Sequence, residues 1–402
     1  MKKLIYLLTI LGFLISCEKN QTFENESQNS LKATVTINAS SVQQTIRGFG
    51  GANIIGWVND LTADQRMKAF DPTNGLGLSV LRVRVSPNSS DWAANKATID
   101  YAKSKGAIVI ASAWSAPASM KDNNSLVGGK LKTTSYADYA NHLKNFCNTV
   151  GGVSAISPVN EPNITVDYES MQMTASEVAA FVAAQGKNCG APIMAPEPYN
   201  MSASFINEYC NNSTAKSNTS YICGHIYGTA SNPPTINQGK EVWMTEYITD
   251  TGDPNNIDNA LNTALDIQRC MNAGYSMFLH WYIRRSYGLI DENSNITKRG
   301  YIVGHFSKWV RPGFQKISCT YNPASNIYVT AYKNGSKLVI VIVNKNSSDV
   351  YQSFSLNGIT VTGFNRWRTT ASANMTNDNF NISGNSFGIT LPAKSITTLV
   401  SK

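Results

Sequence analysis

Eight short apolar segments recur through the middle of this sequence, and most begin about 30–50 residues apart, the length of a βα unit. They span residues 48–51, 78–85, 107–114, 155–159, 192–195, 221–227, 241–247 and 276–282. Helical stretches such as 136–150 and 175–187 separate them. Eight such units over about 260 residues predict a (β/α)8 barrel at residues 47–310. The interval 229–240 is short and rich in Pro, Asn and Gly, so we expect the sixth helix to be missing.

The C-terminal residues 311–402 have a different pattern, in which short alternating segments follow one another closely. Segments 327–332 and 338–343 flank an Asn334-Gly335 turn, which is a strong β-hairpin signal. Further strands are expected at residues 350–356, 364–369, 387–391 and 396–400. These strands predict a small antiparallel β-sandwich as a side domain. A chain of 402 residues exceeds the size of a single hydrophobic core, which agrees with two domains.

The N-terminal residues are expected to lie outside the barrel. Lys2-Lys3 and the apolar stretch 4–15 are typical of an export signal, and Leu14-Ile15-Ser16-Cys17 resembles a bacterial lipoprotein box. We therefore expect a signal peptide at residues 1–17 with lipid attached to Cys17, and a flexible stalk at 18–32. An ordinary secretory signal is the alternative. The protein would then be secreted instead of anchored to a membrane at the cell surface or in the periplasm.

A strand is expected directly after this stalk. Residues 33–38 alternate between apolar and polar side chains but have no place in a barrel. We therefore expect residues 33–46 to join the β-sandwich, which would tie the two domains together.

Charge and composition exclude several classes of function. Only 15% of the residues are charged. The net charge is +8, but the Lys and Arg residues do not cluster in the sequence, so nucleic acid is not an expected partner. The four histidines form no H-x-H pair and the cysteines form no C-x-x-C pair, so we expect neither a metal nor another cofactor. The sequence does not decide between disulfides and buried free thiols for the cysteines at positions 147, 189, 210, 223, 270 and 319.

Functional side chains of such barrels gather at the C-terminal ends of the strands. Read in chain order, these ends carry Arg82, Arg84, Trp114, Asn160, Glu161, Glu197, His225, Tyr227, Glu246 and Trp281. Carboxylates, an amide, an arginine and aromatic rings on one rim suit a sugar site, because aromatic faces stack on pyranose rings and paired carboxylates cleave glycosidic bonds. Three of the ten residues are carboxylates, so their position alone leaves open which two would act.

Short motifs add a family resemblance to this pattern. Asn160-Glu161-Pro162 after one strand and Thr245-Glu246-Tyr247 three strands later resemble the active sites of retaining (β/α)8 glycosidases. Within that clan, residues 48–51 (Gly-Phe-Gly-Gly) and the trailing β-sandwich resemble glycoside hydrolase family 30. The string Trp-Tyr-Ile-Arg-Arg-Ser-Tyr-Gly at 281–288 is similar to the glucuronoxylanase branch of that family. One departure is His280, where the branch tends to carry an aromatic residue; strand alternation turns it away from the sugar.

The resemblance implies that Glu161 is the general acid/base and Glu246 the nucleophile. Their carboxyl groups would then lie roughly 5–5.5 Å apart, and cleavage would proceed with retention through a covalent glycosyl-enzyme. Arg82 and Tyr227 near Glu246 would favour its ionised form, as a nucleophile requires. Asn160 would hydrogen-bond the sugar 2-hydroxyl as the transition state develops.

Arg285 and Tyr287 carry the expectation about specificity. In the resembled branch, the matching residues bind the carboxylate of a 4-O-methylglucuronate branch on xylan. The planar fork of an arginine suits a carboxylate, and a tyrosine hydroxyl adds a neutral donor. The structural alternative is an ion pair of Arg285 with Asp291 or Glu292. The other residues expected to bind sugar are Trp57, Trp114 and Trp281, with a place in the core as an equal alternative for Trp57.

Together these features predict a retaining endo-β-1,4-xylanase that cleaves glucuronoxylan at sites specified by a glucuronic acid branch. Its expected partner is that polysaccharide. We expect a monomer that contacts a membrane only through the lipid on Cys17. The alternatives are another family 30-like β-glycosidase (a β-glucosidase, β-1,6-glucanase or glucosylceramidase-like enzyme) and a surface glycan-binding lipoprotein without catalysis. Glu197 is the rival catalyst, to which the resemblance assigns at most a supporting role.

Overall fold

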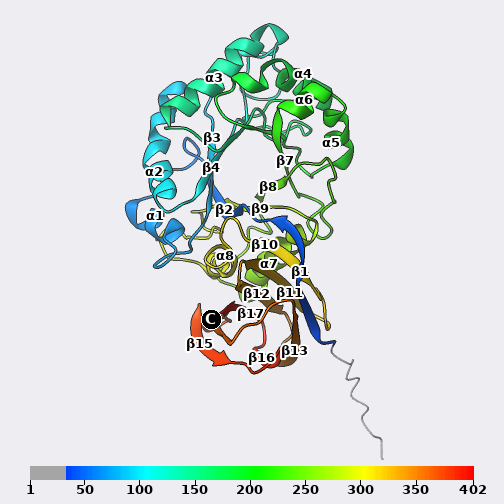
Figure 1. Ribbon diagram of the computed structural model, residues 1–402. Helices are drawn as coiled ribbons and strands as arrows, with labels where there is room; N and C mark the ends of the chain where they lie inside the picture. The colour runs from blue at the N-terminus through cyan, green and yellow to red at the C-terminus, as the bar shows by residue number, and fades with distance from the viewer. Residues whose placement is uncertain (1–32) are drawn as a thin grey trace, which may run out of the picture.

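The computed structural model describes residues 33–402. The expected signal peptide with Cys17 and the expected stalk lie outside the described residues. The described chain forms a closed barrel of parallel strands with a separate curled sheet beside it (Figure 1). This arrangement confirms the predicted fold class of a (β/α)8 barrel with a β-sandwich side domain.

The barrel strands follow the order of the chain, and the last strand closes the barrel against the first. They are β2 (Gly48–Asn53), β3 (Val80–Arg84), β4 (Ile108–Ser112), β5 (Ala155–Ser157), β6 (Ile193–Pro196), β7 (Thr219–His225), β8 (Val242–Tyr247) and β9 (Met277–Tyr282). Each of the eight apolar segments of the sequence overlaps one of these strands. Continuous apolar runs are expected here, because parallel strands covered by helices are buried on both faces.

Helices follow every barrel strand except β7. The α-helices are α1 (Ala63–Phe70), α2 (Lys96–Ser104), α3 (Tyr136–Thr149), α4 (Ala175–Gln185), α5 (Ala203–Cys210), α6 (Ser213–Asn218), α7 (Ile257–Asn272) and α8 (Lys298–Ser307). Short 3-10 helices occur at Ser89–Asn95, Ala118–Met120, Thr133–Ser135 and Gly186–Asn188. Residues 226–241, all of which are described, contain no helix, which confirms that the sixth helix is missing. No helix in residues 33–402 combines the length and apolar character needed to span a bilayer.

The interior of the barrel is layered. Eight apolar side chains fill its lower part: Val80, Ile110, Ala155, Met194, Cys223, Trp243, Met277 and Leu279. Side chains two positions further along a strand point to the same side, so they form the next layer toward the C-terminal mouth. That next layer is polar and contains Arg82, Ser112, Ser157, His225 and Thr245. The alternation of side chains along the strands therefore places a polar layer that includes charged groups directly above the apolar layer.

The side domain is one hydrogen-bonded sheet with the strand order β15-β14-β17-β12-β11-β10-β1-β13-β16. Its strands are β1 (Val35–Thr45), β10 (Gln315–Cys319), β11 (Ile327–Asn334), β12 (Lys337–Asn344), β13 (Val350–Asn357), β14 (Gly363–Thr369), β15 (Thr376–Asn381), β16 (Ser386–Leu391) and β17 (Ser395–Ser401). The sheet curls until its two edge strands approach each other: the ring centroids of Phe387 in β16 and Phe380 in β15 lie 6.0 Å apart. Strand β1 pairs with β10 and β13 in the middle of this sheet.

Helices α7 and α8 lie between the barrel and the side sheet (Figure 1). His305 of α8 is buried and hydrogen-bonds Thr398 at 2.8 Å and Thr369 at 2.9 Å, so both of its ring nitrogens are used in the junction. Gln268 of α7 donates to the Val341 carbonyl at 3.1 Å. Buried hydrogen bonds of this kind fix the two units against each other. The six cysteines left open by the sequence are free thiols in the described chain.

Candidate active site

The candidate active site occupies the polar layers at the C-terminal mouth of the barrel. Thr245 and Glu246 both reach it, although neighbouring residues of a regular strand point to opposite faces. The pairing of β8 with β7 and with β9 shifts register beside these residues. Such a bulge redirects side chains and is common next to active sites. Thr245 consequently hydrogen-bonds Glu197, while Glu246 contacts Arg82.

Glu246 is held by two donors. Arg82 Nη1 donates to Glu246 Oε2 at 2.5 Å, and the Tyr227 hydroxyl donates to Glu246 Oε1 at 2.9 Å. Both carboxylate oxygens are thus occupied, although 6% of the residue is still exposed to solvent at the mouth. Hydrogen bonds from a cation and a hydroxyl fix the orientation of this carboxylate at the mouth of the barrel.

Glu161 follows strand β5 in a left-handed backbone conformation, with φ of 48°. Its backbone N–H donates to the Glu197 carbonyl at 3.0 Å, and its Oε1 lies 2.7 Å from His225 Nδ1. Burial raises the pKa of Glu161; His225 opposes this rise and the charge of Glu246 adds to it. A carboxyl group with a raised pKa keeps its proton nearer to neutral pH, as a general acid must.

The two carboxylates approach closely. One oxygen of Glu161, one oxygen of Glu246 and a ring nitrogen of His225 all lie within 4.8 Å of one another. Retaining glycosidases hold their carboxyl groups about 5–5.5 Å apart, whereas inverting enzymes leave about 6.5–9.5 Å for a water molecule. These three side chains also have the atoms to ligate a metal ion. However, Arg82 and Tyr227 already donate to both oxygens of Glu246, and the Arg82 cation repels another cation there, so the group suits acid–base chemistry better.

Arg82 organises the floor of the site. It is fully buried, and its Nη2 donates to Asn160 Oδ1 at 2.6 Å and to Glu197 Oε1 at 3.1 Å, while its Nε donates to Ser112 Oγ at 3.2 Å. Because the Asn160 oxygen accepts from arginine, its amide N–H groups are left to donate. Asn160 Nδ2 forms no hydrogen bond within residues 33–402, so it can serve a sugar hydroxyl.

Glu197 lies beneath the other two carboxylates. It has no exposed surface, and His225 Nε2 lies 3.4 Å from its Oε1. Burial alone would raise the pKa of Glu197, but Arg82 and His225 outweigh burial and lower it to about 2. Burial would likewise lower the pKa of His225, but Glu246, Glu161 and Glu197 raise it to about 9. Glu197 is therefore an ionised internal group out of reach of substrate, while His225, which the sequence analysis gave no role, is a central member of the site.

Aromatic rings form a wall beside the carboxylates. The ring centroids of Trp57 and Trp114 lie 5.3 Å apart, and those of Trp114 and Trp281 lie 5.8 Å apart. Trp114 is buried with the Arg82 guanidinium 4.5 Å from its centroid, whereas Trp57 and Trp281 are only half-buried. Tyr168 completes this wall at 6.1 Å from Trp57. Half-buried aromatic faces at a mouth of this kind can stack on sugar rings.

Two of the residues around the mouth were missed in the sequence. Tyr168, which is 44% exposed, lies in a long loop without a periodic pattern, so nothing in the sequence pointed to it. Tyr199 stacks on Tyr227 at 4.8 Å and follows the end of β6, so its place after a barrel strand was an available signal. Arg84, by contrast, is tied up in a nearly buried ion pair with Glu169, so its role at the rim is structural.

The two arginines after β9 have different surroundings. Arg284 donates to Glu292 at 3.2 Å and to the Asn59 carbonyl at 3.0 Å. Arg285 forms no ion pair with any carboxylate of the described chain, and its guanidinium carbon lies 5.3 Å from the Tyr282 ring centroid. The neighbouring arginine, and not Arg285, therefore makes the loop ion pair that the sequence left open.

The remaining candidate partner of Arg285 is also engaged elsewhere. Asp291 accepts hydrogen bonds from the backbone N–H groups of Asn293 at 2.9 Å and Asn295 at 2.7 Å. Hydrogen bonding with Tyr287 raises the pKa of Arg285, so its charge is secure. Arg285 borders a hollow of about 560 Å³ that is also lined by Trp57, Asn59, Asp60, Arg284 and Glu292. A charged guanidinium without an internal carboxylate thus faces an open space beside the aromatic wall.

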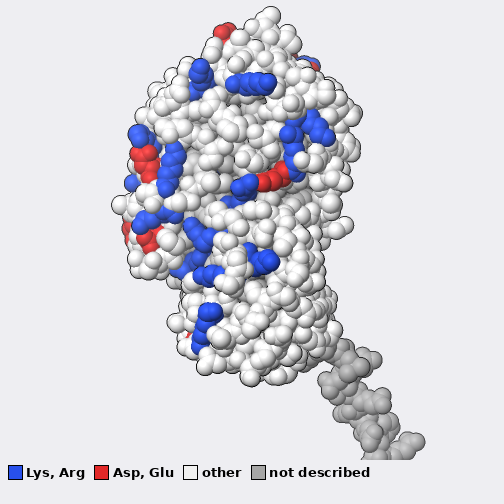
Figure 2. Space-filling view, viewed as in Figure 1, with Lys and Arg blue, Asp and Glu red and all other residues white. Residues whose placement is uncertain are grey.

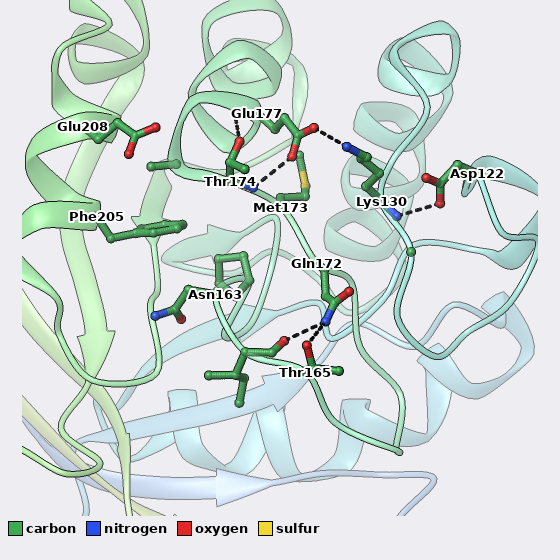
Figure 3. A pocket seen from close by; sticks show the side chains of 14 residues that line it. Asp122, Lys130, Asn163, Thr165, Gln172, Met173, Thr174, Glu177, Phe205 and Glu208 are labelled. Carbon is green, nitrogen blue, oxygen red and sulfur yellow. Dashed lines mark hydrogen bonds and ion pairs between the residues drawn. The ribbon is translucent and has the colours of Figure 1, made fainter.

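A second hollow, of about 570 Å³, lies beside the loops after β4 and β5 (Figure 3). Its charged side chains already have partners: Lys130 Nζ lies 2.9 Å from Glu177, whose carboxylate also accepts from the Thr174 backbone at the start of α4. Asp122 accepts from the Lys130 backbone at 2.9 Å, and Glu208 from the Ser176 hydroxyl at 2.8 Å. Neither Glu161 nor Glu246 lines it. The chemistry therefore belongs to the mouth of the barrel and not to this hollow.

The fold and the sequence are similar to those of known proteins. No family model matches the sequence. The glucuronoxylanase XynC of Bacillus subtilis strain 168 is 39% identical over 386 residues, which cover 91% of each chain. The structure of the family 30 subfamily 8 xylanase of Clostridium acetobutylicum matches with a TM-score of 0.85 and 32% identity, over 92% of this chain and 99% of that one. A GH30 endoxylanase of Clostridium papyrosolvens matches with a TM-score of 0.84 and 30% identity, over 92% and 100% of the two chains. This chain therefore belongs to the glucuronoxylanase branch of glycoside hydrolase family 30.

Proposed function

We propose that this protein is a retaining endo-β-1,4-xylanase that cleaves glucuronoxylan at positions specified by a glucuronic acid branch. The approach of Glu161 and Glu246 to within 4.8 Å, in one cluster with Arg82 and His225, carries the proposal. Relatives named glucuronoxylanase and family 30 xylanase support the substrate class. The mostly uncharged face in Figure 2, where charged side chains occupy separate small patches, agrees with a polysaccharide partner.

The reaction proceeds in two steps. In the first, the Glu246 carboxylate attacks the anomeric carbon while Glu161 transfers its proton to the departing glycosidic oxygen, so a glycosyl ester forms and one part of the chain leaves. In the second, Glu161, now a carboxylate, takes a proton from water, whose oxygen displaces Glu246. The Asn160 amide donates to the sugar 2-hydroxyl and stabilises the oxocarbenium-like state. Two inversions at the anomeric carbon give net retention.

Arg285 and Tyr287 supply the specificity in this proposal. The glucuronate carboxylate takes the place of the missing internal partner of Arg285 and receives two charge-assisted hydrogen bonds. Trp57 and Trp281 contact neighbouring sugar rings, with Trp114 supporting them from the buried side. A family member specific for a neutral β-glucoside would have no use for an unpaired cation here, and a protein that only binds glycans would have none for two crowded carboxylates, so neither alternative is favoured.

The location of the protein is a further part of the proposal. Lys2-Lys3, the apolar stretch 4–15 and the lipoprotein-like motif at Cys17 support export and lipid attachment. Replacement of Cys17 by Ser should abolish labelling with a fatty-acid analogue and release the enzyme from the membrane fraction. Labelling that persists in the Cys17→Ser protein would contradict lipid attachment at this residue.

A mass-resolved digest of glucuronoxylan tests the activity. The proposed specificity predicts products that each carry one uronic acid at a fixed place near the reducing end. A xylan of the same backbone without uronic acid branches is the matched substrate control and should be cleaved far more slowly. Equal rates on both polymers would remove the carboxylate-recognition part of the proposal, and faster turnover of an aryl β-glucoside than of any xylan would remove the substrate class.

A further inference from the structure

A single oxygen atom connects the groups beneath the catalytic pair. Glu197 Oε1 accepts hydrogen bonds from Thr245 Oγ1 at 2.7 Å and from Ser112 Oγ at 3.1 Å. Two nitrogen-based groups also contact this oxygen, because Arg82 Nη2 lies 3.1 Å away and His225 Nε2 lies 3.4 Å away. Glu197 has no exposed surface and has a left-handed backbone with φ of 56°. Non-glycine residues hold such a conformation only where their surroundings impose it, and they cluster at functional sites.

The two nitrogen-based groups that meet at Glu197 each serve one catalytic carboxylate. Arg82 donates to Glu246, and His225 contacts Glu161 through its other ring nitrogen at 2.7 Å. Glu197 is therefore the link between the nucleophile side and the acid side of the site. Glu197 lies one layer below the mouth, so it connects the two sides without contacting the sugar.

The charges of this cluster balance in one particular protonation state. The charged and titratable groups that face His225 are Glu161, Glu197, Glu246, Arg82 and Tyr227. His225 has a pKa of about 9 and Glu197 a pKa of about 2, so both are charged near neutral pH. With Glu246 and Arg82 also charged, the cluster is neutral when Glu161 holds a proton. A buried site without net charge avoids the cost of an uncompensated ion.

We propose that Glu197 is a positioning residue, which holds His225 as an imidazolium and through it directs the acid proton of Glu161 toward the glycosidic oxygen. An imidazolium donates from both ring nitrogens, to Glu197 and to Glu161, and so leaves the acid proton of Glu161 free for the substrate. A neutral imidazole that donates to Glu197 would instead accept that acid proton at Nδ1. Because Glu161 Oε1 accepts the Nδ1 proton, the proton of the acid is carried by Oε2, the oxygen left for the substrate. The inference rests on the proposed function, and it assigns a role to a carboxylate that does not contact the substrate.

The same arrangement serves the second half of the reaction. When Glu161 has given its proton to the leaving group it becomes an anion, and Glu246, bound as an ester, has lost its charge. The cluster is again neutral, and the His225 cation now stabilises the Glu161 carboxylate until it takes a proton from water. Glu197 keeps the imidazolium in place throughout, so that neither step requires the site to reorganise.

The protonation state of His225 tests this proposal directly. The chain contains four histidines, and burial lowers the pKa of the other three, His142, His280 and His305. Imidazole 1H–15N spectra of protein purified without a histidine tag should therefore show one imidazolium at pH 7.5, which titrates near pH 9. A wild-type His225 that is neutral at pH 7.5 would overturn the proposal without any variant.

Glu197→Gln tests the role of the negative charge. The His225 midpoint should fall by more than about one pH unit, since an opposite charge at this distance shifts a pKa by about 1–3 units. On glucuronoxylan, kcat should fall about 10- to 100-fold because the acid is no longer aimed, with little change in KM. Thr245→Val is the matched control, because it removes a neutral hydrogen bond to the same oxygen and should leave the His225 midpoint in place.

The outcomes separate this inference from the proposed function. An unchanged His225 midpoint in Glu197→Gln would overturn the inference, even if activity were lost. If that variant does not fold, the wild-type titration decides. A protein that fails to cleave xylan but shows the expected His225 titration and its shift would support the cluster and overturn the proposed substrate.

Discussion

Replacement of Arg285 by Ala is expected to separate recognition of the branch from cleavage of the backbone. Arg285 has no carboxylate partner among the described residues, so its removal breaks no ion pair in the free protein. Its contact with the buried ring of Tyr282, at 5.3 Å, is a cation–π interaction of a partly exposed guanidinium, worth about 0.5–1 kcal/mol. The free energy of unfolding should therefore fall by no more than about 1 kcal/mol.

The effect on activity should be larger and confined to the substituted polymer. A charge-assisted hydrogen bond contributes about 1.5–3 kcal/mol, but Arg285 is partly exposed, and solvent screening reduces the joint contribution of its two bonds to about that same range. This corresponds to a loss of about 10- to 150-fold in kcat/KM on glucuronoxylan. On a xylan without uronic acid branches, the variant and the wild type should have similar kcat/KM.

Arg284→Ala is the matched control for this prediction. It removes an adjacent arginine of the same loop and breaks the ion pair with Glu292, an interaction between partly exposed groups worth about 0–1 kcal/mol. The ratio of activities on branched and unbranched xylan should stay as in the wild type. The assay is kcat/KM on the two polymers with thermal unfolding measured in parallel. An equal loss on both polymers in Arg285→Ala, or a change in the ratio in Arg284→Ala, would refute the assignment of Arg285 to the branch.

Three further perturbations test other parts of the structure. Glu246→Gln should lower kcat by at least about 1,000-fold, because the nucleophile is lost. Mass spectrometry should then detect no glycosyl-enzyme. Sugar release near the wild-type rate would disprove the assignment of Glu246 as the nucleophile. Burial raises the pKa of Asp266 to about 6, so the folded protein binds a proton more tightly than the unfolded chain, and stability should decline as pH rises from about 4 to 6. Asp266→Asn should remove this dependence and raise stability at pH 7 by about 1–3 kcal/mol, as measured by urea unfolding at pH 4 and pH 7; equal effects at both pH values would contradict it. Trp243→Ala should lower the free energy of unfolding by about 3–5 kcal/mol in the same assay, because the Trp243 side chain is buried inside the barrel and stacks on Tyr221 at 3.7 Å between ring centroids.

Much of the architecture followed from local patterns in the sequence. The eight apolar segments fell on the eight barrel strands, and the interval without a helix lay where composition indicated it. The hairpin around Asn334-Gly335 formed as β11 and β12. Strand β15 was missed because its sequence, Thr-Asn-Asp-Asn-Phe-Asn, has a single apolar residue and therefore shows no alternation of apolar and polar side chains. The strand lies at the edge of the sheet and pairs only with β14, so few of its side chains need to be apolar. The strong local signals were those of segments buried on both sides.

The candidate catalytic residues were also predicted only in part. Glu161 and Glu246 were selected because the short motifs around them resemble those of retaining glycosidases, and their places at or after the ends of barrel strands bring them to one rim. The link from Glu197 through His225 and Arg82 was not predictable, since it depends on which of several rim side chains point inward and at what depth. Only the layering of the closed barrel and the register shift beside Glu246 determine that.

Sequence by itself therefore determined the class of fold and brought three carboxylates to one rim, because periodicity and the ends of strands are local properties. The choice of two of these carboxylates came from the family resemblance of the short motifs around them. Tertiary structure alone decided which arginine stays free for a ligand, which carboxylate is buried beneath the site, and where Tyr168 joins the aromatic wall. These depend on distances between segments far apart in the chain. Packing sets such distances, and no single segment encodes them.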